Sequence, residues 1–185
     1  MIGTNRFGFY LQKKENNIEI KMIVNNINLM EYKYNNQIRT TTWDHLSIID
    51  FFVDNLKYIL QDDNYPFETN DRSGIQMSRD SGLKFDWHKI ENGDNQEIEK
   101  LERSAELLDL WVQKHNWFYY RDCAYVPDVA FRKVNGKIEI SWDNNDIFED
   151  EILFTSLEGC EYIDLVEFEI VIKELIIQYR KIINE

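Results

Sequence analysis

Residues 126–143 of the chain are VPDVAFRKVNGKIEISWD, and this stretch decides the fold class. Asn135-Gly136 is the strongest two-residue signal for a β-hairpin, because both turn positions must adopt positive φ angles. Apolar and polar residues alternate on both sides of the turn, and the apolar ones include Val129, Phe131, Ile138, Ile140 and Trp142. The alternation predicts two antiparallel strands, at 126–133 and 137–142, that share one buried face.

Further stretches of the chain show the same strand-like alternation. Residues 6–12 and 17–24 flank the polar tetrapeptide 13–16, which predicts a second antiparallel hairpin. Residues 27–34 and 152–155 each predict one more strand. The sequence therefore contains five to six candidate strands.

Apolar residues at three- and four-residue spacing predict helices. The first helix is expected over about 42–60, with Thr41 as its N-cap and Asp44 in its first turn. The second is expected to begin at Gln96 and to carry its apolar stripe as far as His115.

The last helix is expected to begin at a capping box formed by Asp164 and Glu167. It is apolar on most sides, which predicts a central position and would also let it bury against a second copy of the chain. The order of elements lacks regular βαβ alternation, so we expect an α+β fold with an antiparallel sheet of about five to six strands packed against three main helices. Residues 1–185 are expected to form a single domain, with a polar and loop-rich segment at 61–95.

The composition is typical of a folded intracellular protein. Hydrophobic residues make up 43% of the 185 residues and aromatic residues 14%, which is enough to fill a core despite a net charge of -13. No window approaches the roughly 20 apolar residues of a membrane span, and the N-terminus lacks the apolar stretch of a signal peptide. The two cysteines, Cys123 and Cys160, do not form a disulfide framework. We expect a cytoplasmic protein, and the richness in Ile, Asn, Lys and Glu indicates a bacterial or phage genome rich in A and T.

No motif in the sequence specifies a catalytic or cofactor site. The histidines have neither HExxH nor HxH spacing, and no Cys/His pair begins a zinc site. A phosphate-binding GxxxxGK loop and a GxSxG nucleophile elbow are also missing. We therefore predict no catalytic residue, no bound metal and no cofactor.

The acidic charge is concentrated in one part of the chain. Residues 138–172 contain 11 acidic side chains and neither Lys nor Arg. Such a segment can steer association with a basic protein, with aromatic residues as anchors, although a solvated surface that only keeps the protein soluble remains the alternative. The candidate interface residues are Trp142, Asp143, Asp146, Phe148, Glu149, Asp150 and Glu151.

Residues 126–143 also carry a family resemblance. Together with Thr42-Trp43 at the start of a helix and Pro66-Phe67 after it, they resemble the accessory region found ahead of bacterial ImmA/IrrE-type zinc peptidase domains. The peptidase motif HExxH itself is absent. The resemblance implies a sensing or partner-binding module without protease activity, in a mobile-element or phage-defence setting.

The sequence thus favours a non-enzymatic intracellular protein-binding module, such as an immunity-like protein or a regulatory or sensor subunit in a toxin or phage-defence system. Its expected partner is another protein with a basic surface, rather than nucleic acid or a membrane, and a homodimer is also compatible with the sequence. A second hypothesis is an acidic DNA mimic that inhibits a DNA-binding enzyme. A third is an enzyme whose site is assembled from Arg121, Asp122, Asp128 and Arg132.

Overall fold

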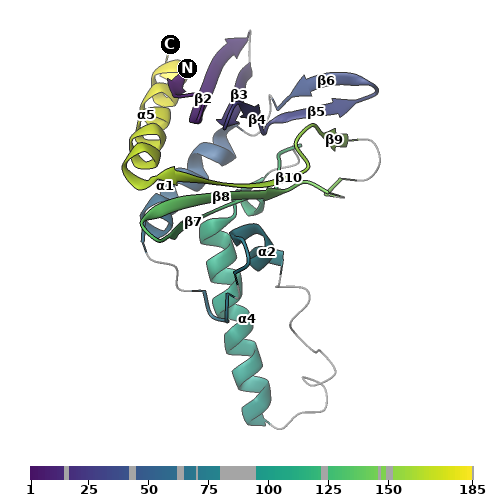
Figure 1. The fold of residues 1–185 in the computed structure, drawn as a ribbon, viewed down its shortest axis with the longest axis vertical. Helices are drawn as coiled ribbons and strands as arrows, with labels where there is room; N and C mark the ends of the chain where they lie inside the picture. The colour runs from purple at the N-terminus through teal and green to yellow at the C-terminus, as the bar shows by residue number, and fades with distance from the viewer. Residues whose placement is uncertain are drawn as a thin grey trace.

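The computed structural model in Figure 1 describes residues 1–14, 17–41, 45–61, 65–69, 71–79, 95–121, 125–145, 147–148 and 152–184. Within these ranges the chain consists of α-helices and antiparallel β-strands, which confirms the expected α+β class. The expectation of a single sheet of five to six strands is wrong, because the strands form three small sheets of four, three and three strands. The assignment of residues 1–185 to one domain stays a prediction.

The first sheet contains the N-terminal hairpin. Its strands follow the order β1 (Ile2–Gly3), β2 (Phe7–Lys14), β3 (Asn17–Val24) and β4 (Ile27–Asn28). The predicted alternation is confirmed, since every second residue along each strand is buried in the main core: Phe7, Phe9, Ile18, Ile20, Met22 and Val24.

The second sheet contains the Asn-Gly hairpin, in the order β10 (Glu158–Asp164), β8 (Lys137–Asp143) and β7 (Val129–Val134). The turn is confirmed by φ angles of 51° at Asn135 and 77° at Gly136. One face of this sheet belongs to the core, and the short helix α2 (Gly74–Ser78) packs on β7 and β8. Strand β10 was not predicted, because its polar sequence has one well-buried apolar residue, Ile163.

The third sheet has the order β6 (Gln37–Thr40), β5 (Glu31–Tyr34) and β9 (Ile152–Phe154). The first and third sheets are separated by a break between β4 and β5. The strand predicted over 27–34 is interrupted at Leu29 and Met30, which are adjacent and both fully buried. Two neighbouring buried side chains break the alternation of a strand, so β4 and β5 belong to different sheets.

Three of the reversals between strands use pairs of residues with positive φ. These pairs are Asn25-Asn26 between β3 and β4, Asn35-Asn36 between β5 and β6, and Asn135-Gly136 between β7 and β8. Asn tolerates the left-handed region better than other residues with a side chain. The reversals therefore depend mainly on asparagine.

The three long helices confirm the sequence predictions. They are α1 (His45–Ile59), α4 (Asn95–His115) and α5 (Leu165–Asn184), with the 3-10 turn η2 (Trp117–Tyr120) after α4. The Oδ1 atom of Asp164 accepts from the backbone N–H groups of Val166 (2.9 Å) and Glu167 (3.2 Å), which confirms the N-cap of α5. Thr41 donates its hydroxyl hydrogen to the Tyr125 carbonyl (2.7 Å). Residues 42–44, including Asp44, lie outside the described residues, so the N-cap of the first helix stays a prediction.

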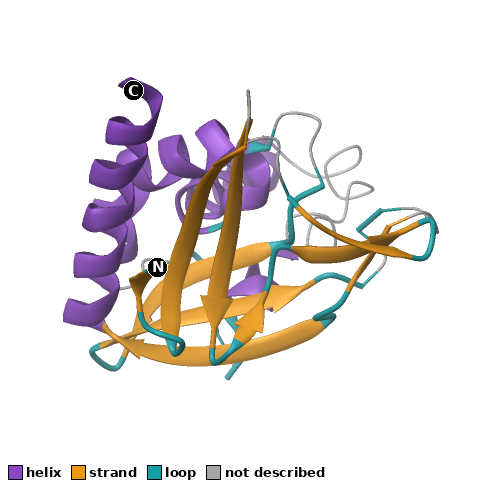
Figure 2. Ribbon diagram, turned by 90° about the horizontal axis from the view of Figure 1, so that it is seen from above, coloured by secondary structure: helices purple, strands orange, loops and turns teal. Residues whose placement is uncertain are grey.

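The last helix is not central, in contrast to our expectation. One face is buried, whereas several apolar residues on the opposite face are exposed. Figures 1 and 2 both show α5 at the margin of the molecule. The number of apolar residues suggested burial on all sides, but they are divided between two faces. Among the described residues, no helix has the length and apolarity to cross a membrane.

An aromatic cluster holds the helices and the first two sheets together. The ring of Phe52 in α1 lies 5.3 to 6.4 Å, between centroids, from five aromatic rings of β2, β7, α1, α5 and η2. These rings belong to Phe9, Phe51, Trp117, Phe131 and Phe168. Aromatic pairs at such distances stabilise a core beyond their burial alone. The cluster therefore fixes the inner face of the β7–β8 hairpin.

The contact between Gly159 and Trp142 provides a test of this packing. A methyl group added at Gly159 would collide with the Trp142 ring. Gly159→Ala should therefore lower the free energy of unfolding by about 1–3 kcal/mol, measured by urea denaturation. Its exposed neighbour Glu158 is the control, and Glu158→Ala should change that free energy by no more than about 0.5 kcal/mol. Equal effects of the two variants would show that the close contact is unimportant.

Candidate functional site

A buried polar layer lies between α2 and the second sheet, with the Glu139 carboxylate at its centre. Glu139 is only 1% exposed. Its Oε2 atom lies 2.9 Å from Nη2 of Arg132, on the neighbouring strand. Its Oε1 atom accepts hydrogen bonds from the backbone N–H of Gly74 (2.5 Å) and from the hydroxyl of Ser141 (3.1 Å). The carboxylate thus joins β7, β8 and α2.

The first turn of α2 is built to meet this carboxylate. Ser73 and Gln76 form a capping box, and the Ile75 N–H donates to the Ser141 hydroxyl (3.0 Å). The helix therefore directs two of its free backbone N–H groups at side chains of β8. Gly74 permits this approach, since an added Cβ would lie 3.3 Å from the Glu139 carboxylate.

The Arg132 guanidinium is the second centre of the layer. Besides its ion pair with Glu139, it donates to the Arg72 carbonyl (2.7 Å) and to the Met77 sulfur (2.8 Å). Both charged side chains are more than nine-tenths buried. A buried pair of this kind is costly to break, because the remaining partner becomes an unpaired buried charge.

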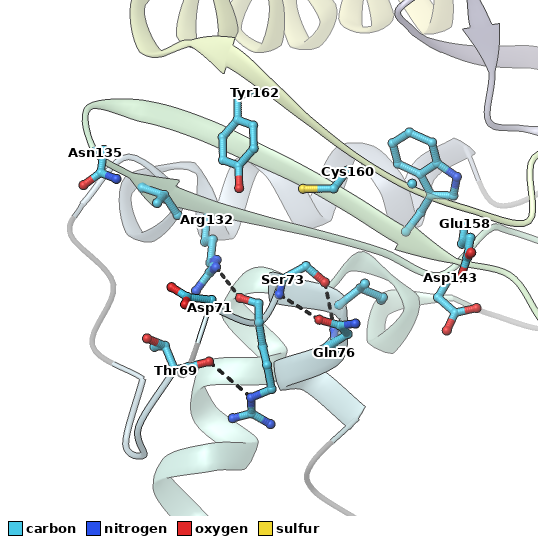
Figure 3. A pocket seen from close by; sticks show the side chains of 15 residues that line it. Thr69, Asp71, Ser73, Gln76, Arg132, Asn135, Asp143, Glu158, Cys160 and Tyr162 are labelled. Atoms are coloured by element: carbon cyan, nitrogen blue, oxygen red, sulfur yellow. Dashed lines mark hydrogen bonds between the residues drawn. The ribbon is translucent and has the colours of Figure 1, made fainter.

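An open cavity of about 780 Å³ lies beside the polar layer. Figure 3 shows Cys160 and Tyr162 on β10, pointing toward the side where Arg132 lies. The Tyr162 hydroxyl donates to Oε2 of Glu139 over 3.3 Å. The opposite wall is formed by the segment before α2 and its first turn, including Thr69, Asp71, Ser73 and Gln76.

The surroundings of the cavity raise the pKa values of two side chains that line it, Tyr162 and Cys160. Burial, and then the negative charge of Glu139, raise the pKa of Tyr162 to about 12. The same two causes, in the same order, raise the pKa of the Cys160 thiol. A cysteine nucleophile needs a lowered pKa, and a tyrosine base would have to ionise near neutral pH. At neutral pH the Tyr162 hydroxyl donates to Glu139 and the Cys160 thiol remains a weak hydrogen-bond donor, which suits binding better than nucleophilic attack.

A second cavity, of about 470 Å³, lies near the other end of α2. Three buried polar residues line it: Ser78, Asn116 and Asp128. The Asn116 amide donates to Asp128 (2.7 Å) and to the Ser78 hydroxyl (3.2 Å), and Arg79 lies 3.6 Å from the Asp128 carboxylate. Burial raises the pKa of Asp128, and the bonds from Asn116 and Arg79 oppose this shift.

The residues of the enzyme hypothesis are only partly brought together. Arg121 and Asp128 line the second cavity, whereas Arg132 lines the first. Asp122 lies outside the described residues. The Arg121 guanidinium lies over the rings of Phe118 (3.7 Å to the centroid) and Phe148 (5.3 Å). The three described residues therefore do not converge on one cavity.

The structure describes three of the candidate interface residues. Trp142 is 2% exposed, and its indole N–H donates to the Ser156 hydroxyl (2.9 Å). It alternates in β8 with Glu139 and Ser141, so it lies on the core face and cannot anchor a partner in this conformation. Asp143 forms an ion pair with Arg79.

Phe148 is half-buried and contacts the rings of Phe118, Tyr125 and Phe154. The other candidate interface residues, Asp146, Glu149, Asp150 and Glu151, lie outside the described residues. In the part of the chain that the structure describes, no group of three or more His, Cys, Asp or Glu side chains could hold a metal ion.

The ion pair of Arg132 and Glu139 can be tested by removing one partner. Glu139→Ala leaves the Arg132 charge buried, so the free energy of unfolding should fall by about 3–5 kcal/mol in urea denaturation. The control is Glu169→Ala in the exposed pair of Glu169 and Lys173 on α5 (2.6 Å), which should cost about 0.5 kcal/mol or less. A similar loss in both variants would contradict a special role for the buried pair.

The protonation of Cys160 can be followed by the pH dependence of its alkylation, in a Cys123→Ser variant that keeps one thiol. Since burial and Glu139 raise the pKa of Cys160, the reaction with iodoacetamide should reach half its maximal rate at a higher pH than that of a cysteine peptide. Glu139→Gln removes the nearby negative charge and should move this midpoint to lower pH. A midpoint at or below that of the peptide would favour a nucleophilic cysteine instead.

No family model, curated protein or solved structure matches this chain. Its function therefore has to be inferred from the chemistry of the two cavities and of the surface around them.

Proposed function

We propose that the chain is a non-enzymatic protein-binding module that docks a basic partner protein through its acidic surface. The observation that carries this proposal is a run of five carboxylates that are exposed or half-buried along β10 and the first turns of α5. Neither Lys nor Arg occurs from residue 138 to residue 172. The five residues are Glu158, Glu161, Asp164, Glu167 and Glu169.

The structure separates these surface carboxylates from the internal ones. Within the same acidic segment, Glu139 and Asp143 are neutralised by Arg132 and Arg79, and Glu169 on the surface is paired with Lys173. Glu139 and Asp143 contribute to the fold and offer little net charge to a partner. Within residues 138–172, the surface carboxylates that the structure describes therefore lie on β10 and α5, further along the chain than the interface we expected around residue 146.

The chemistry of the first cavity supports binding over catalysis. The oxygens of Glu139 already accept hydrogen bonds from Gly74, Arg132, Ser141 and Tyr162. A carboxylate engaged in this way is a poor general base, since its lone pairs point at protein donors. Tyr162 donates its hydroxyl hydrogen to this carboxylate, and the protonated Cys160 thiol beside it can donate a weak hydrogen bond to a bound group.

Electrostatic steering explains what such a surface would do. A cluster of carboxylates raises the rate of encounter with a basic protein and repels acidic ones, and salt weakens the effect. An immunity-like protein or a regulatory subunit of a toxin or phage-defence system would use this property in the bacterial cytoplasm. The resemblance of residues 126–143 to the accessory region of ImmA/IrrE-type proteins supports this setting.

The test is affinity capture from a lysate of the host cell, with captured proteins quantified by mass spectrometry. The double variant Glu158→Lys/Glu161→Lys reverses two charges on β10 and should reduce capture of a basic partner by about tenfold or more. Raising the salt concentration should weaken capture by the unchanged chain in the same direction.

The matched control is Glu102→Lys/Glu106→Lys, which makes the same change of net charge on exposed residues of α4. Equal losses in the two variants, or capture that salt does not weaken, would contradict an acidic docking surface on β10. Captured proteins that duplex DNA displaces would instead support the DNA-mimic hypothesis.

A further inference from the structure

The second cavity has a floor of buried polar side chains. Ser78, Asn116 and Asp128, which line it, are exposed by 4%, 2% and 7%. Asn116 links the three, because its amide donates to both of the others. Its Oδ1 atom accepts from the Phe118 N–H (2.8 Å) and caps the turn η2. One side chain therefore fixes both the floor of the cavity and the turn that forms its wall.

The two arginines that line the cavity have different surroundings. Arg79 is shared between the carboxylates of Asp128 (3.6 Å) and Asp143, so its charge is neutralised within the protein. The Asp128 carboxylate, which would repel an anion, is held at the floor by Arg79 and Asn116. In the described part of the chain, Arg121 has no carboxylate partner. An anion that enters the cavity would therefore find its partner in Arg121.

Aromatic rings hold the Arg121 guanidinium in place. It lies over the Phe118 ring, 3.7 Å from the centroid, and 5.3 Å from the centroid of the Phe148 ring. A guanidinium on the face of a ring keeps the N–H groups in its own plane available for hydrogen bonds. The side chain is exposed, so a ligand can reach these donors. Because the guanidinium is already ordered, it loses little entropy when it pairs with an anion.

The cavity also offers apolar surface close to this charge. Tyr119, which is 52% exposed, and the half-buried Phe118 both line it. Its volume of about 470 Å³ lies within the range of roughly 300–1,000 Å³ that is typical of small-molecule sites. Such sites combine aromatic walls with a few polar groups that orient the ligand. A flat apolar molecule with one anionic group matches this combination.

We propose that the second cavity binds a small aromatic anion, either a carboxylate or a phosphate monoester. The acidic group pairs with the guanidinium of Arg121, and the aromatic body packs against Tyr119. Both kinds of acidic group present two oxygens to the forked N–H groups of an arginine. This inference goes beyond the proposed function, which concerns the acidic surface and not the second cavity.

NMR titration of the isotope-labelled full chain, with benzoate and phenyl phosphate as probes, tests the site. Each probe should shift the backbone signals of Asn116, Phe118 and Arg121, with a dissociation constant of about 1 mM for such small ligands. Benzamide has the ring without the charge and should bind about tenfold more weakly or less. Acetate has the charge without the ring and should also bind more weakly than benzoate. The tighter of the two anionic probes identifies the preferred acidic group.

Three variants separate the contributions of charge and ring. Arg121→Ala should raise the dissociation constant of benzoate by about tenfold or more. The matched control Arg103→Ala removes the same charge from an exposed position of α4 and should leave that constant unchanged. Tyr119→Ala should weaken the binding of benzoate and leave that of acetate unchanged. All three side chains are exposed, so the variants should unfold at nearly the same urea concentration as the unchanged chain.

Several results would overturn the proposal. They are equal binding of benzamide and benzoate, equal effects of Arg121→Ala and Arg103→Ala, and no saturable binding of either anionic probe. Shifts confined to residues of the first cavity, such as Gly159, would also place the ligand elsewhere. The capture experiment changes residues of β10, so the two tests can fail independently.

Discussion

The arrangement of the polar half of the molecule depends on one buried carboxylate, that of Glu139. It lies on the face of β8 that points away from the aromatic core, where water would otherwise solvate it. Arg132, Ser141, Tyr162 and the first turn of α2 replace that water with hydrogen bonds. A buried charge demands such partners, so Glu139 determines where α2 lies on the sheet. The two cavities lie near opposite ends of that short helix.

The same charge also controls the chemistry of its surroundings. A negative charge held in a site with little water acts over several ångströms, because little solvent screens it. Burial, and then this charge, raise the pKa values of Cys160 and Tyr162, although both line an open cavity. The arrangement that stabilises the fold thus reduces the reactivity of two residues that would otherwise be candidates for catalysis.

Local sequence patterns predict much of the fold. They also contain enough information to predict one part of the site, the ion pair of Arg132 and Glu139. The two hairpins and the three long helices follow from alternation, turn residues and helical spacing. Arg132 and Glu139 are equidistant from Asn135-Gly136, so the hairpin register pairs them directly. Their opposite charges could have suggested the ion pair. The division into three sheets and the partner of β10 depend on contacts distant in sequence, which alternation does not encode.

The expected interface shows how a sequence pattern can mislead. Trp142 lies within the acidic segment of the sequence, but its position in β8 puts it on the core side with Ile138 and Ile140. The alternation of apolar and polar residues in the hairpin already predicts that Trp142 lies on the buried face. An anchor residue has to lie on the exposed face of a strand, and neither its residue type nor acidic neighbours in the sequence indicate that face.

The asparagine turns have a consequence for how this fold can be encoded. Five of the six non-glycine residues with positive φ in the described part of the chain are asparagines. Glycine is the usual residue for such positions, and its codons are rich in G, whereas asparagine codons are rich in A. A genome under strong pressure toward A and T can therefore keep tight β-turns while using little glycine. Each asparagine at positive φ costs a small amount of conformational energy. In return, the turns do not require glycine or its G-rich codons.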